Sequence, residues 1–280
     1  MPHAGALAAA GQSGGRPGDV VAWFADPANW QGESGVPNRL VEHLGLSAAA
    51  LGIACLVAMP VGLWLGHVGR GGVLAVNVSN IGRAVPTFAV LVLLALAPAP
   101  FGLGTVSTVT ALVLFAIPPI LTNCYVGMRE VDPDTVDAAR GVGMSGSQVL
   151  RRVELPLAVP LVMTGVRLAA VQVVATATIA ALVAGGGLGR IITNGFARQD
   201  QAELVAGAIL VAALAILVEA VMEVTGRAVD PGRRAGRRSA RRSARAADRG
   251  ADSVGEQPGE QERAQVADQV AAQAALVRRV

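Results

Sequence analysis

The stretch that most constrains this chain runs from Ala84 to Met128 and contains no Asp, Glu, Lys, Arg or His. About 20 apolar residues are enough for a helix to cross the hydrocarbon core of a bilayer, so this stretch is long enough to cross twice. The sequence PAPFGLG, from Pro98 to Gly104, supplies proline and glycine residues for a turn between the two crossings. The stretch therefore predicts two consecutive membrane helices.

Three more apolar runs are long enough to cross a membrane, and they cover Leu46–Leu65, Leu157–Ala184 and Leu204–Met222. Arg167 interrupts the second of these runs, and Glu219 lies near the end of the third. Charged residues make up 15% of the chain, against about 25% in soluble domains, and the mean hydropathy is +0.51. These observations predict an all-α membrane protein with five spans.

Arginine placement predicts the orientation of the spans. Cytoplasmic loops are enriched in Lys and Arg, and the run RRAGRRSARRSAR begins at Arg233. A cytoplasmic C-terminus then puts residues 67–83 and 127–156 on the cytoplasmic side and the N-terminal segment outside. We expect a flexible leader with an interfacial aromatic segment at 1–37, a transmembrane domain at 38–226 and a basic, disordered tail at 227–280 that is attracted to anionic lipids. A sixth span within the leader is the alternative.

A polar segment, DAARGVGMSGSQVLRRVELP, lies between two of the predicted spans at residues 137–156. It predicts one short helix, a turn built on Gly141 and Gly143, and a second short helix. The second helix is expected to end near Pro156, because a residue before proline is biased away from the helical conformation.

This segment resembles the EAA loop of the permease subunits of ABC importers. The family's pattern is Glu-Ala-Ala, then a glycine four residues on, then Ile-x-Leu-Pro, and here Asp stands for Glu and Val for Ile. The matching positions are Asp137, Ala138, Ala139, Gly143, Val153, Leu155 and Pro156.

The resemblance implies a mechanical role for the segment. It implies that two permease subunits, identical or homologous, each present this loop as a coupling helix to a separate ATP-hydrolysing subunit. The chain contains no lysine, and a phosphate-binding P-loop needs one. We therefore expect a transport subunit and not an enzyme, with ATP hydrolysis in a partner chain, and we expect no cofactor and no metal site.

Other stretches resemble the osmoprotectant branch of these permeases. They are NRLVEHLGLSAAALGIACLVAMPVGLWLGH, NIGRAVPTFAVLVLLAL, LTNCYVGM and GGGLGRIITNG, and the resemblance covers about residues 38–226. It implies import of glycine betaine, choline or carnitine, delivered by an extracytoplasmic binding protein. Aromatic residues are only 3% of the chain, so we expect no aromatic cage for a quaternary ammonium here. Amino-acid permeases, such as those for methionine, share the GGGLG stretch and are the alternative.

Polar side chains within the spans are candidates for lining the transport path. Because a charge at the centre of a membrane helix is costly, we expect Arg167 to extend toward the cytoplasmic interface. The stretch GGGLG at 185–189 is expected to be a flexible turn or gate. The candidate path residues are Asn123, Thr164, Gln172, Thr176 and Thr178.

Two function classes outside this family are alternatives. An ion-coupled secondary transporter uses carboxylates inside the membrane, and Glu219 is the one carboxylate near a span. A membrane-anchored nucleic-acid binder could use the arginine-rich tail, but the tail lacks interleaved aromatic residues. The sequence favours the importer subunit, with no nucleic-acid partner.

Overall fold

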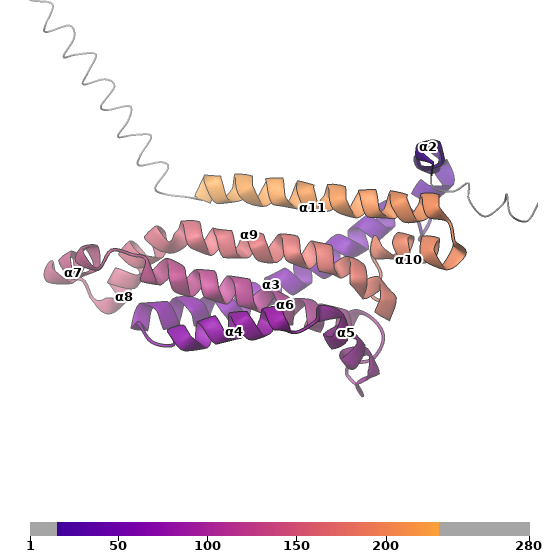
Figure 1. Ribbon diagram of the computed structural model, residues 1–280. Helices are drawn as coiled ribbons and strands as arrows, with labels where there is room; N and C mark the ends of the chain where they lie inside the picture. The colour runs from indigo at the N-terminus through magenta and orange to yellow at the C-terminus, as the bar shows by residue number, and fades with distance from the viewer. Residues whose placement is uncertain (1–15, 230–280) are drawn as a thin grey trace, which may run out of the picture. The chain divides into compact units, whose positions relative to one another are not determined.

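The computed structural model describes residues 16–229, and within that range every regular element is a helix (Figure 1). Four helical segments are long and apolar enough to cross a membrane. This confirms the predicted all-α membrane fold. The four segments are α3 (Val36–Val68), α6 (Thr105–Arg129), the continuous segment Gly146–Val183 that contains α9 (Leu155–Ala180), and α11 (Gln201–Val229).

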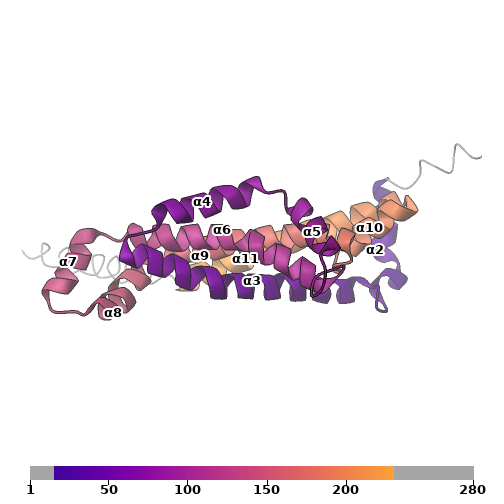
Figure 2. The ribbon, with the colours of Figure 1, turned by 90° about the horizontal axis from the view of Figure 1, so that it is seen from below.

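The helices α3, α6 and α9 pack against one another and form the centre of the described chain (Figure 2). Small residues let their backbones approach closely. A Cβ added to Gly62 on α3 would lie 2.7 Å from Cys124 Cβ on α6, and one added to Gly165 on α9 would lie 2.6 Å from Asn123 Cβ. Close approach through glycine and alanine is the usual way in which membrane helices gain packing energy.

The second predicted span begins at Ala84, and the structure has only the short helix Thr87–Leu96 within it, which corrects the sequence prediction. The structure has α4 (Gly72–Ala84) and α5 (Thr87–Leu96), with Val85 and Pro86 in extended conformations between them. Proline has no N–H to continue the helix and disfavours helical geometry in the preceding residue. At 1.5 Å per residue, α5 is about 15 Å long, roughly half of the hydrocarbon thickness.

Helical structure also begins earlier than predicted. The helix α3 begins at Val36 with a proline in its first turn, and it is preceded by α2 (Pro17–Ala25) and the 3-10 turn η1 (Pro27–Trp30). In this aromatic segment the indole N–H of Trp30 donates to the Phe24 carbonyl at 2.9 Å, and α2 contacts α11. The predicted flexible leader, up to residue 15, and the predicted disordered tail, from residue 230, lie outside the described residues.

The contact between α6 and α9 gives a first test of the fold. We expect Gly165→Val to lower the melting temperature of the purified protein in detergent, because the new Cβ meets Asn123 Cβ and, at 2.9 Å, the carbonyl oxygen of Pro119. Overpacking of this kind typically costs about 1–3 kcal/mol. The matched control is Gly52→Val on α3, where an added Cβ meets nothing within 4 Å. Equal melting temperatures for the two variants would contradict the packing.

Candidate functional site

The predicted coupling segment forms two short helices with well-defined beginnings. In α7 (Pro133–Gly141), the carboxylate of Asp132 accepts from the Asp134 N–H at 3.0 Å and from the Thr135 hydroxyl at 3.2 Å. In α8 (Gly146–Val149), Ser145 and Gln148 form a capping box. These side chains satisfy backbone N–H groups that the first turn of a helix leaves free.

The turn between the two short helices is built on Gly143. Its φ is +87°, and its N–H donates to the Arg140 carbonyl at 2.9 Å. Gly141 is the last residue of α7, with no positive φ, so the turn uses one of the two predicted glycines. A Cβ added to Gly143 would meet nothing within 4 Å. The glycine is therefore required by backbone conformation and not by lack of space.

The second short helix does not end near Pro156, which corrects the sequence prediction. It continues through a π-helical segment, η2 (Leu150–Glu154), directly into α9. Pro156 lies in the first turn of α9, where its missing N–H interrupts the regular ladder, and the N–H of Leu155 instead donates to the Leu150 carbonyl. A π-segment absorbs such an irregularity without breaking the helix. The coupling segment is thus an extension of a membrane helix.

The motif residues divide into exposed and inward positions. Asp137, Ala138 and Gly143 are exposed, and Asp137 lies 3.5 Å from Arg140. Ala139 is buried, so it packs within the segment and is not on its outer face. The remaining motif residues are half-buried at the start of the continuous helix: Val153, Leu155 and Pro156.

Glu154 is a residue of this segment that the motif match passed over. Its side chain is 7% exposed, and its Oε2 lies 2.5 Å from Nδ1 of His67, close to the end of α3. The pair therefore joins α3 to the base of the coupling segment. The sequence does show a carboxylate next to apolar residues in VELP, but it does not indicate that His67 is the partner of this carboxylate.

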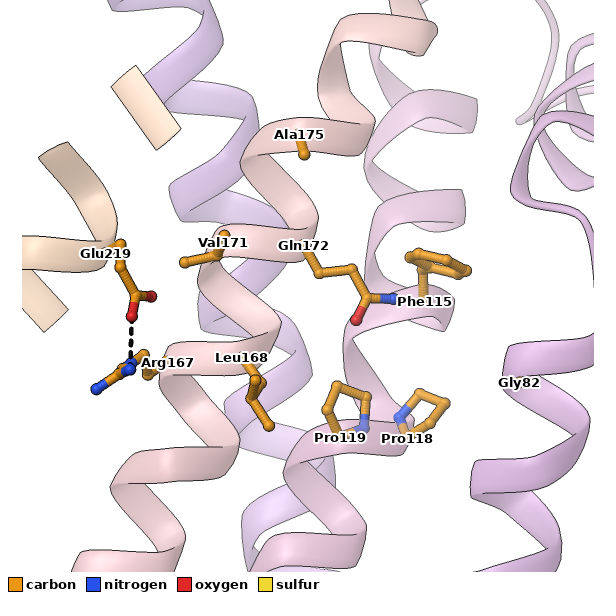
Figure 3. A pocket seen from close by; sticks show the side chains of 10 residues that line it. All are labelled: Gly82, Phe115, Pro118, Pro119, Arg167, Leu168, Val171, Gln172, Ala175 and Glu219. Carbon is orange, nitrogen blue, oxygen red and sulfur yellow. Dashed lines mark ion pairs between the residues drawn. The ribbon is translucent and has the colours of Figure 1, made fainter. Parts of the chain in front are cut away.

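Of the five candidate path residues, Gln172 alone lines a pocket described here, with a volume of about 390 Å³ (Figure 3). Asn123 and Thr164 donate instead to carbonyls of their own helices, those of Pro119 and Pro160. Thr176 is buried, and the buried hydroxyl of Thr178 has no partner among residues 16–229. The structure does not gather the five into one site. The pocket is lined by Gly82, Phe115, Pro118, Pro119, Arg167, Leu168, Val171, Gln172, Ala175 and Glu219.

Arg167 forms an ion pair that the sequence interpretation did not include. Its Nη2 lies 2.6 Å from Oε1 of Glu219, and this ion pair joins α9 to α11 (Figure 3). The two residues are far apart in the sequence, so the spacing of the apolar runs gave no signal that they meet.

The glycine-rich turn at 185–189 is held in place by α3. The N–H of Gly187 donates to Oε2 of Glu42 at 3.0 Å, and a Cβ added to Gly187 would lie 2.9 Å from Nδ1 of His43. His43 is fully buried, and its Nε2 lies 3.0 Å from the Val174 carbonyl oxygen on α9. The turn therefore makes specific contacts with the helix beside it.

Residues 58–235 match the family described as the binding-protein-dependent transport system inner membrane component. The chain belongs to this family. The match includes the whole coupling segment and every helix from α4 to α11. The ABC importer permease resemblance drawn from the sequence is thereby confirmed.

Curated relatives of this permease carry osmoprotectant names. It is 34% identical to the glycine betaine/carnitine/choline transport system permease protein OpuCB of Bacillus subtilis, over 68% of this chain and 86% of that one. It is 36% identical to the carnitine transport permease protein OpuCD of Listeria monocytogenes, over 68% and 84%. It is 31% identical to the osmoprotectant import permease protein OsmW of Salmonella typhimurium, over 72% and 92%.

Solved structures share the permease fold. An inward-facing structure of the MetNI methionine ABC transporter matches with a TM-score of 0.60 at 21% identity, over 69% of this chain and 95% of that one. An amino acid ABC transporter crystallised with histidines matches with a TM-score of 0.54 at 19% identity, over 67% and 91%. At these identities the likeness concerns the fold alone.

The pair of His67 and Glu154 generates a prediction about stability. We expect His67→Ala to lower the free energy of unfolding by about 1–3 kcal/mol, because it leaves a buried carboxylate without its partner. His67→Gln, which retains a hydrogen-bond donor, should lose less. The melting temperature in detergent measures the stability of both variants. The double variant His67→Ala/Glu154→Leu should recover part of the stability that His67→Ala loses, because it removes the unpaired carboxylate. If His67→Ala melts like the wild type, the pair does not hold the segment to α3.

Proposed function

We propose that this permease forms the membrane path of an ATP-driven importer for a small osmoprotectant such as glycine betaine, choline or carnitine. The substrate class is supported by the names of several relatives that are 31–36% identical to it over most of their length. The solved amino-acid transporters, at 19–22% identity, share the fold and do not favour an amino-acid substrate.

The observation that carries the mechanism is the continuity of α8 with α9. The segment α7–α8 lies at one end of the helices (Figure 1), and Gly146–Val183 is helical throughout. A partner that binds the exposed residues Asp137 and Ala138 and moves α8 therefore also moves a membrane helix. We assign this partner role to a separate ATPase subunit, because a chain without lysine has no P-loop of its own.

Two further partners complete the proposed importer. An extracytoplasmic binding protein delivers the substrate, and a second copy of this permease or a homologous permease forms the other half of the path. The helices α3 and α11 leave most of their apolar surface uncovered within this chain, which leaves room for lipid and for a second permease. The helix α11 runs toward the end that carries α7 and α8 (Figure 1), which supports a cytoplasmic C-terminus.

Transport should require the ATPase subunit. We expect concentrative uptake of labelled glycine betaine into liposomes that contain the permease, its ATPase and the binding protein with ATP. Liposomes with the permease alone and an ion gradient are the control. Uptake in the control would contradict the proposal and favour an ion-coupled transporter, and uptake of methionine in place of betaine would favour the amino-acid alternative.

The turn at Gly143 gives a test of the coupling role. We expect Gly143→Val to weaken binding of the ATPase subunit about tenfold, because a β-branched residue at this positive φ costs about 1–3 kcal/mol. Gly143→Asn should bind better, since asparagine tolerates the left-handed conformation. The matched control is Gly141→Val, which is also exposed but lies in helical backbone. Capture of the ATPase by immobilised permease measures the effect, and equal capture by the Gly143→Val and Gly141→Val variants would contradict it.

A further inference from the structure

The ion pair between Arg167 and Glu219 joins two membrane helices at positions away from the ends of both helices. At 1.5 Å per residue, Arg167 is about 18 Å along α9 from its start at Leu155, and Glu219 is about 15 Å before the end of α11 at Val229. Their side chains are 40% and 38% exposed within this chain. The pair is therefore neither at the end of a helix nor enclosed by the helices that carry it.

Such a position is costly beside lipid. Charged residues within membrane helices are rare for this reason, and those found there usually face protein or a water-filled cavity. The exposed side of the pair opens onto the pocket shared by α4, α6, α9 and α11. We therefore take this face to line the aqueous path and not the hydrocarbon.

The pocket has two chemically different parts. Figure 3 shows the ion pair on the α11 side of α9, and Gln172 pointing toward Phe115 and the two prolines of α6. One part thus offers a positive and a negative charge, and the other offers an amide, an aromatic ring and apolar surface. Its volume of about 390 Å³ is within the range of pockets that hold small molecules, which starts near 300 Å³.

We infer that this pocket is a low-affinity binding site for a small zwitterion, with Arg167 binding the carboxylate and Glu219 the ammonium group. The inference rests on the proposed function and names a site for its substrate class. A zwitterion replaces each member of the ion pair with an opposite charge, so neither side chain is left unpaired. A ligand with only a positive charge leaves Arg167 without a partner. Binding replaces the ion pair between Arg167 and Glu219 with two ion pairs to the ligand. Because one ion pair is lost, the net free energy of binding stays small, as is needed for a ligand that must dissociate again.

The pocket also accounts for binding without an aromatic cage. Phe115 alone supplies an aromatic surface for a methylated ammonium, whereas tight recognition of such groups uses several aromatic rings. We therefore expect dissociation constants in the millimolar range, about −4 kcal/mol of binding free energy.

The test measures binding of glycine betaine and of choline to the permease–ATPase complex in nanodiscs, without binding protein, by ligand-observed NMR. We expect the wild type to bind betaine more tightly than choline. Arg167→Gln should weaken betaine binding about tenfold, because a charge-assisted contact is lost, and should leave choline binding unchanged or stronger. Glu219→Gln should weaken binding of both ligands. Arg167→Lys, which keeps the charge, should give intermediate betaine binding.

The matched controls are Glu223→Gln and Arg227→Gln, which break another ion pair on α11 outside the pocket lining. They should bind both ligands like the wild type. Equal weakening of betaine and choline in Arg167→Gln, together with a lower melting temperature, would show that the pair only joins α9 to α11 and would overturn the proposal. Absence of betaine binding to the wild type would overturn it as well. Uptake assays test the proposed function independently of the site. A complex that binds zwitterions but imports no osmoprotectant would contradict the proposed function and leave the binding site intact.

Discussion

Close contact among α3, α6 and α9 is the constraint on which the rest of the structure depends. Lipid tails are as apolar as the helix surfaces, so burial of apolar area drives helix association only weakly, and van der Waals packing must do more. Gly62 and Gly165 allow backbones to approach where any larger side chain would meet a neighbour below 3 Å. The contacts are continued by buried alanines on α3 and α9. The course of α9 across the membrane is fixed by this packing.

Two sets of polar contacts tie α3 to α9 near opposite ends. At one end, His67 on α3 meets Glu154 at the start of α9. At the other, Glu42 binds the turn after α9 through Gly187, and His43 meets the Val174 carbonyl. A helix held at both ends by a neighbour that it also packs against along its length moves with that neighbour. Force applied to α8 is therefore expected to rock α3, α6 and α9 together and not to bend α9 alone.

Much of this architecture could be predicted because it depends on local sequence. Long apolar runs marked four membrane helices, and the capped, glycine-bearing segment at 137–156 was found by the spacing of its motif. The second span was misjudged because hydropathy alone does not register the break that Pro86 imposes. Likewise, α8 was expected to end near Pro156, because the sequence does not show that a π-helical segment joins α8 to α9.

The contacts that give the candidate sites their chemistry could not be predicted, because they join residues distant in sequence. His67 and Glu154 are 87 positions apart, and each has a plausible local role, one near a helix end and the other in a polar loop. Arg167 on its own suggested a side chain extending to the interface. Only the packing of α11 on α9 brings Glu219 to it, and that packing is decided by surfaces of both helices.

The position of Arg167 on α9 links the two proposed sites physically. The same helix carries the coupling segment at its beginning and the arginine in its middle, and its packing on α3 and α6 makes it rigid between them. The contact of α9 with α11 is less enclosed than its contacts with α3 and α6. The ion pair between α9 and α11 is partly exposed, and most of the surface of α11 is not covered by the rest of the described chain. If α9 rocks when α8 is moved, we expect the distance between α9 and α11 to change and the two charges to separate. Under the proposed zwitterion site, separated charges are free to bind a ligand and re-paired charges are not, so we expect access to the pocket to follow the position of the coupling segment.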